Sequence, residues 1–253
     1  MLFRSIEPKL RFKPEVLGPR IAFHPNLLFR QVEYEATYRQ LTGLRVFRQV
    51  VITPEIVGTD KLDIYLKLFP VPKQNFVAQV EGTNSGGNFG IAGSFSYNNN
   101  NLFHGAEMLE FKVRGGTEAQ QPFGTNTQTT GPSQFAFNTI SAGADATLNI
   151  PREFFPFGIF VRKRLREEDR RAQERRTVFM STFNYQKRVD YDRSLGNASY
   201  GYTFRYKSYS RFGFFPVELN VVKVKPGAGL SELLANSDPL LRYRFTDHLI
   251  SDM

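Results

Sequence analysis

The sequence predicts a mainly β protein: a small α+β unit, followed by about six or seven antiparallel strands of an incomplete transmembrane β-barrel. Runs of strict alternation between apolar and small or polar residues fill Gln74 to Gln120 and recur further along the chain. Successive side chains of a strand point to opposite faces, so each run has one apolar and one polar face. The polar parity carries glycine and charge, which suits a hydrated interior behind a lipid-facing wall. The sequence contains no run of about eighteen apolar residues, so it predicts no membrane-spanning helix.

Composition leaves a soluble alternative open. The 253 residues include 25 Phe and 11 Tyr, many near the ends of alternating runs, where a membrane barrel has aromatic girdles. A phenylalanine-rich soluble β core would explain the same aromatics. The net charge of +9 suits an acidic partner, anionic lipid or nucleic acid. Because the charges are spread out and no ribonucleoprotein-type aromatic motif is present, we expect no nucleic-acid binding.

The first 73 residues predict the α+β unit. Residues 2–12 suit an edge strand, and Pro14 begins a short helical piece that reaches residue 22. Apolar residues at helical spacing predict a helix over 31–44, which Gly43 ends. Two alternating runs, 46–57 and 61–71, predict a hairpin with one face under the helices.

From Gln74 onward the pattern predicts a different domain, 74–253, built from barrel strands. The expected strands are 74–83, 88–98, 107–117, 135–150, 177–189, 198–209 and 217–225, with another beginning in 241–250. A long polar loop follows residue 117, and a shorter loop is expected over 190–197. Residues 229–236 suit one or two helical turns.

Between two of these strands lies a segment rich in aromatic residues and arginine. It suits a solvated turn or frayed helix, or else a segment that dips into the edge of a bilayer while its arginines meet lipid phosphates. The candidate lipid-interface residues are Phe154, Phe155, Phe157, Phe160, Arg162 and Arg164.

The sequence offers little catalytic chemistry, and no enzyme or cofactor is expected. The three histidines lie in separate segments without metal-ligand spacing, and no cysteine is present to form disulfides or thiolate sites. No phosphate-binding glycine loop opens a helix. Glu107, Glu110 and Glu118 could form an acid–base group with Arg114, but charges pairing across strands on the inner face are the simpler interpretation.

Two stretches resemble a known superfamily. YRQLTGLRVFRQVVI with DKLDIYLKLFP resembles a polypeptide-transport-associated (POTRA) domain, and GNFGIAGSFSYNNNNLFHGAEMLEFKVRGGTEAQ resembles the first barrel hairpins of the BamA/TamA superfamily. FNYQKRVDYDRSLGNASYGYTF, FPVELNVVKVKP and LLRYRFTDHLI resemble its TamL-like branch. The likeness covers almost the whole chain and is distributed over it.

The resemblance implies a periplasmic POTRA domain ahead of an outer-membrane barrel of roughly sixteen strands. Since the smallest barrels need about eight strands and no signal peptide opens the sequence, we expect an internal fragment of such a protein. The turn Asn101, Leu102, Phe103 and Gly105 would face the periplasm. The first barrel strand would act as a lateral gate, at Phe76, Val77, Ala78, Gln79 and Val80.

The implied role is the insertion or translocation of outer-membrane proteins. Its partners would be unfolded outer-membrane clients, outer-membrane lipids and periplasmic or inner-membrane assembly proteins. Clients would add a strand to the gate by β-augmentation. A passive porin or transporter, and the secreting barrel of a fused lipase-type passenger, remain alternatives, although no Gly-x-Ser-x-Gly elbow is present.

Overall fold

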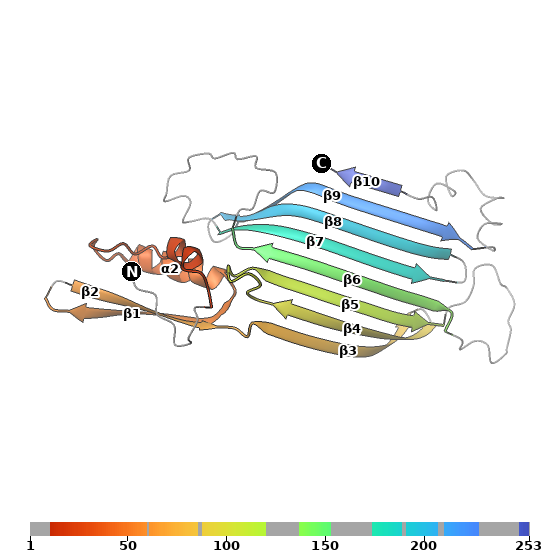
Figure 1. Ribbon diagram of the computed structural model, residues 1–253, viewed down its shortest axis with the longest axis horizontal. Helices are drawn as coiled ribbons and strands as arrows, with labels where there is room; N and C mark the ends of the chain where they lie inside the picture. The colour runs from red at the N-terminus through yellow and green to blue at the C-terminus, as the bar shows by residue number, and fades with distance from the viewer. Residues whose placement is uncertain are drawn as a thin grey trace.

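The computed structural model describes residues 11–59, 61–85, 88–119, 137–152, 174–188, 191–206, 210–227 and 248–252. The fold is mainly β, and the described residues form two antiparallel sheets, one of two strands and one of eight. The two-stranded sheet and the helices lie at one end of the large sheet, as Figure 1 shows. Within the described residues, none of the helices is long and apolar enough to cross a membrane.

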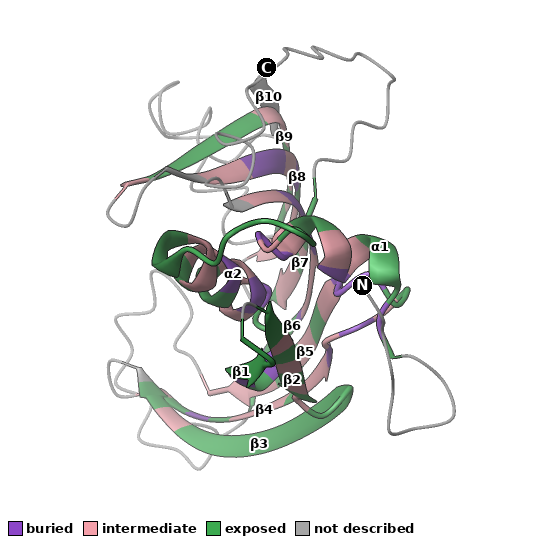
Figure 2. Ribbon diagram, turned by 90° about the vertical axis from the view of Figure 1, so that its left-hand side faces the viewer, coloured by how far each residue is buried: buried purple, intermediate pink, exposed green. Residues whose placement is uncertain are grey.

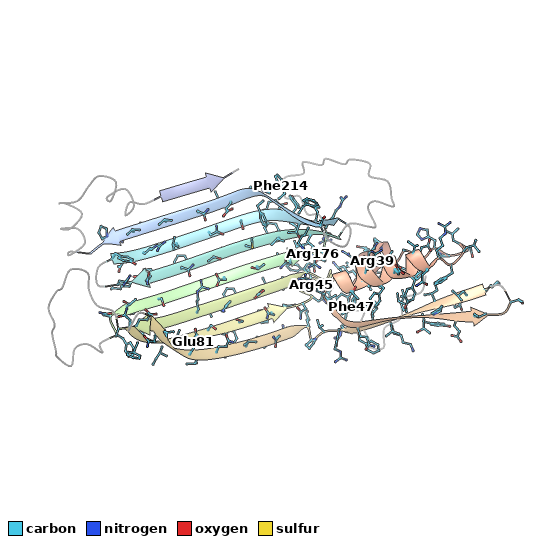
Figure 3. All side chains as sticks on the ribbon, turned by 180° about the vertical axis from the view of Figure 1, so that it is seen from behind. Arg39, Arg45, Phe47, Glu81, Arg176 and Phe214 are labelled. Carbon is cyan, nitrogen blue, oxygen red and sulfur yellow. The ribbon has the colours of Figure 1, made fainter. Side chains whose placement is uncertain are left out.

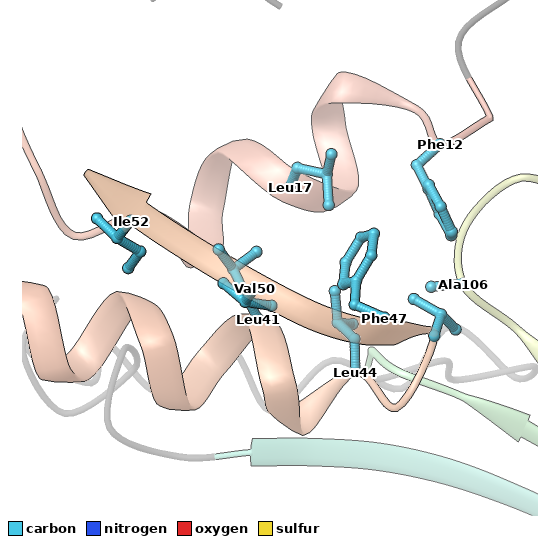
Figure 4. Packing of buried hydrophobic residues seen from close by; sticks show 9 residues of the cluster. Phe12, Leu17, Leu41, Leu44, Phe47, Val50, Ile52 and Ala106 are labelled. Carbon is cyan, nitrogen blue, oxygen red and sulfur yellow. The ribbon is translucent and has the colours of Figure 1, made fainter. Parts of the chain in front are cut away.

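The N-terminal unit consists of α1 (Pro14–Leu17), a 3-10 turn (Gly18–Arg20), α2 (Gln31–Gly43) and the hairpin β1 (Phe47–Val57) and β2 (Lys61–Pro70). Its core joins the end of α2 to one face of β1, as seen in Figure 4. Leu41, Leu44 and Val46 are almost completely buried there. The predicted helix and hairpin are therefore present, and the hairpin packs its apolar face against the helix.

The large sheet runs in sequence order, each strand antiparallel to the next. Its strands are β3 (Gln74–Ser85), β4 (Asn88–Asn99), β5 (Met108–Glu118), β6 (Thr139–Ile150), β7 (Glu174–Lys187), β8 (Tyr191–Tyr206), β9 (Ser210–Pro226) and β10 (His248–Asp252). An end view shows that the strands follow a curved path from β3 to β9 (Figure 2). Within the described residues, β3 and β10 are the two edges.

Two expectations about these strands were wrong. Among the described residues the large sheet has eight strands rather than about six or seven; the strand expected to begin in 241–250 is present as the short β10, which pairs with β9. The loop expected over 190–197 is instead the first half of β8, from Tyr191 onward. Its Asp, Ser, Gly and Asn residues resemble a turn in sequence, but both neighbouring strands pair with them in register.

Other predictions lie outside the described residues. They are most of the edge strand over 2–12, the whole lipid-interface segment 154–164, the helical turns over 229–236 and the first part of the strand in 241–250.

Candidate functional site

The predicted gate residues lie on an edge strand. β3 pairs through twelve residues with β4, from Gln74 opposite Asn99 to Ser85 opposite Asn88. No described strand pairs with its other side. Its side chains are exposed: Phe76 is 59% exposed and Val80 is 83% exposed. A strand in this position presents unpaired N–H and C=O groups that can template another strand.

The first residues of β3 are fixed by the β4–β5 turn. The backbone N–H of Asn100 donates to the carbonyl of Lys73 at 2.8 Å, and its side-chain amide donates to the carbonyl of Pro72 at 2.9 Å. The link between β2 and β3 is therefore held against the turn. The predicted gate strand and the predicted turn meet at this point.

The turn owes its shape to one buried carboxylate. Glu107 is 2% exposed, and its Oε2 accepts the backbone N–H groups of Gly105 at 2.8 Å and Phe103 at 3.3 Å. A Cβ at position 105 would overlap this carboxylate, which explains the glycine there. The Arg152 guanidinium lies 3.6 Å from Oε1. Glu107 therefore pairs with a cation from beyond the neighbouring strand β6, but it precedes β5 and folds back into the turn, whereas the sequence had suggested a charge on the inner face.

The same turn is anchored in the N-terminal unit. Asn101 is buried; its amide donates to the carbonyl of Arg11 at 2.6 Å, and its side-chain oxygen accepts the N–H of Ala106 at 3.1 Å. Ala106 is 1% exposed and belongs to the same apolar cluster as Phe12 and the end of α2. The β4–β5 turn is thus part of the core of the N-terminal unit as well as of the large sheet.

A second set of contacts joins the unit to the middle of the sheet. Arg176 of β7 donates to the carbonyl of Gly43 at the end of α2, and Arg20 donates to the carbonyl of Pro151 after β6. Figure 3 shows Arg176 beside Arg45, at the boundary between sheet and helix. No local pattern predicts these contacts, since each arginine bonds a backbone carbonyl more than a hundred positions away.

One face of the large sheet is apolar and exposed. The registers place the apolar parities of β3 to β9 on this single face. Its exposed large side chains are Phe76, Val80, Phe89, Ile91, Phe95, Phe111, Ile140, Phe183, Phe212, Phe214, Leu219 and Val221. Soluble monomers rarely expose a continuous apolar surface of this extent.

The opposite face is polar and organised by a cross-strand network. Arg114 of β5 donates to the Asp145 carboxylate on β6 at 2.6 Å and, reaching past Gly143, to the amide oxygen of Asn184 on β7. A Cβ at Gly143 would lie 2.7 Å from Nε of Arg114 and 2.9 Å from the Asn184 oxygen, so the glycine makes room for this link. Arg114 thus pairs with Asp145 rather than with the glutamates considered from the sequence.

The residues predicted to form the turn differ in burial. Asn101 and Gly105 are buried elements of the junction, whereas Phe103 lies exposed beside it.

Among the described residues, no group of three or more His, Asp or Glu side chains could hold a metal ion. No family model matches the sequence, and neither does any of the curated proteins compared with it.

Proposed function

We propose that the large sheet is part of the wall of an outer-membrane β-barrel, with its apolar face toward lipid and its polar face toward a hydrated interior. The alternation of apolar and polar residues supports this. So does the position of the apolar belt, by which we mean the band of exposed apolar side chains on the apolar face. On the apolar face of β3 and β4 the belt reaches Val80 and Ile91, far from the N-terminal unit. In β9 it begins only at Val221 and extends to Phe214 and Phe212, close to that unit.

The belt therefore crosses the strand registers obliquely. On the same face, beyond the belt, charged side chains take over in β7 to β9: Lys187, Asp192 and Lys225 lie in one row. Strands of a barrel tilt by about 35–45° from its axis, so a band perpendicular to that axis must cross the registers in this way.

Aromatic pairs support the same orientation. Phe76 and Tyr97 have ring centroids 5.1 Å apart on β3 and β4, and Phe179 and Tyr200 are 4.7 Å apart on β7 and β8. Both pairs lie on the apolar face, toward the end that carries the N-terminal unit. They suit the girdle on the periplasmic side of a barrel, which would place that unit in the periplasm, as the resemblance to a POTRA domain implies.

Within such a barrel, the proposed role is the insertion or translocation of other outer-membrane proteins, as in the BamA/TamA superfamily. The observation that carries this role is β3, a twelve-residue edge strand whose start is fixed and whose outer side has no partner among the described strands. In hydrocarbon, each unpaired backbone group costs several kcal/mol. A client strand that pairs with β3 removes this cost, which is the driving force of β-augmentation.

Site-specific crosslinking tests this role, and the absence of cysteine in the chain simplifies it. Single cysteines at Val77, Ala78, Gln79 and Val80 would be combined with cysteines along the terminal strand of an outer-membrane client during assembly into vesicles. We expect disulfides that follow one antiparallel register. Ser96→Cys is the matched control, because it lies opposite Val77 but on β4, which has partners on both sides.

Client crosslinks at β4 equal to those at β3 would contradict templating by the edge. In a closed barrel, a disulfide could lock the outer side of β3 to the final strand of the barrel. Normal assembly of clients by such a locked barrel would also contradict templating. Either result would favour the passive porin or transporter, for which the polar, charged inner face would line a solute path.

A further inference from the structure

The polar face contains a hollow of about 400 Å³ that the proposed function does not use. Side chains from six strands line it, from Gln79 and Glu81 on β3 to Arg193 and Leu195 on β8. Since one hollow touches both β3 and β8, the polar face must be the concave side of the curved sheet.

The hollow exists because the middle strands carry small residues at these rows. Ala92, Gly116 and Ser141 are consecutive cross-strand neighbours on β4, β5 and β6. Longer side chains surround this floor: Glu81 continues the row on one side, and Gln186 with Arg193 continues it on the other.

Two amide side chains in the hollow, Gln79 and Asn184, have donors left to offer. The amide oxygen of Gln79 already faces the hydroxyl of Ser94 at 3.5 Å, and that of Asn184 accepts from Arg114. Each amide therefore has its NH₂ group left to offer, because an amide has one oxygen and two N–H donors. Both side chains line the hollow.

Two cations add to these donors. Lys112 lies directly opposite Asp145, but that carboxylate is paired with Arg114. Neither Lys112 nor Arg193 has an ion pair among the described residues. The charged groups that line the hollow are the cations Lys112, Arg114 and Arg193 and the carboxylate Glu81, and Asp145 lies nearby. Three positive and two negative charges leave a net charge of one positive unit.

We propose that this hollow binds an oxyanion, held by Lys112 and Arg193 and by the amide N–H groups of Asn184. Carboxylate and phosphate share the required chemistry, which is a compact negative group with several acceptor oxygens. Its source is either an acidic side chain of a polypeptide at the concave face or a free inorganic anion. The inference does not depend on lipid contact or on a gating role for β3.

Binding can be measured on the full chain folded in detergent and exchanged into phosphate-free buffer. Isothermal titration with inorganic phosphate tests the free anion, and titration with a short acetylated glutamate peptide tests the polypeptide source. Because each charge-assisted hydrogen bond contributes about 1.5–3 kcal/mol, we expect K112Q and R193Q each to weaken binding about tenfold or more. A peptide that binds while phosphate does not would identify the polypeptide as the source, and the reverse would identify the free anion.

Two controls keep the result specific. The double variant Lys61→Gln with Lys67→Gln removes the same charge from β2, outside the hollow, and should bind like the parent chain. Ser141→Phe changes no charge but fills the floor, and it should abolish binding while circular dichroism shows the sheet intact. Failure of both ligands to bind the folded parent chain, or equal weakening in the β2 variant and in K112Q with R193Q, would overturn the proposal.

Discussion

Replacing Phe183 by arginine tests the lipid-facing assignment most directly. Phe183 lies on the apolar face of β7, is 51% exposed, and stands in a central row with Ala144 and Gly196. Arginine at the midplane of an outer-membrane barrel costs about 2–4 kcal/mol of insertion free energy. At about 1.4 kcal/mol per factor of ten, the insertion equilibrium should fall about 30- to 1,000-fold.

If the sheet were soluble, the same substitution would have a smaller energetic cost. Half of the Phe183 side chain is already exposed, so its loss in water removes only about 1 kcal/mol of burial. The neighbouring Thr182→Arg is the matched control, because Thr182 is on the polar face opposite Asp145. There an arginine stays hydrated and should change stability by about 0.5 kcal/mol or less.

The assay is a urea titration of the full chain folded into phospholipid vesicles. Because the chain has no tryptophan, far-UV circular dichroism and protection from protease report folding in place of tryptophan fluorescence. Insertion of the Phe183 variant at parent level would refute the lipid-facing assignment. Equal losses in the two variants would show that the two faces do not differ in environment.

Two further substitutions test the junction and the inner network. Glu107→Ala should destabilise the chain by about 2–3 kcal/mol in urea, because the buried N–H of Gly105 and the part-buried N–H of Phe103 lose their acceptor. The exposed Glu110→Ala should change stability little, and equal effects of the two variants would contradict the role of the buried carboxylate. Gly143→Ala should lower the free energy of unfolding by about 1–2 kcal/mol, because its Cβ would displace Arg114. Gly196→Ala is the control and should not have this cost, because no atom lies within 4 Å of the added Cβ. A neutral Gly143→Ala would show that the cross-strand link is dispensable.

The sequence predicts the strands well because alternation is a local signal. Every strand expected from residue 46 onward is present among the described residues, and the two parities of β4, β5 and β6 fall on opposite faces. The first half of β8 was missed for the same reason. Its residues Asp192 to Asn197 have the composition of a turn, and only their pairing with β7 and β9 makes them a strand.

The junction was less predictable, because its interactions connect distant parts of the chain. The turn at Asn101 to Gly105 could be placed by its composition, but not its contact with Arg11, ninety positions earlier. Glu107 looked like one more strand charge, because nothing local shows that its carboxylate turns back to the N–H of Gly105. A glycine two residues before an acidic residue is too common a pattern to predict such a turn.

The junction also has a consequence for how an added strand would pair. Asn100 fixes the backbone of Pro72 and Lys73, so β3 starts from a defined point with a defined register. Beyond that point, the outer side of β3 is open among the described residues. A template ordered before its partner arrives leaves only the partner's entropy to be lost on pairing, which favours association. If β3 is a template, the N-terminal unit therefore contributes to its affinity by holding its first residues in place, without any direct contact with the added strand.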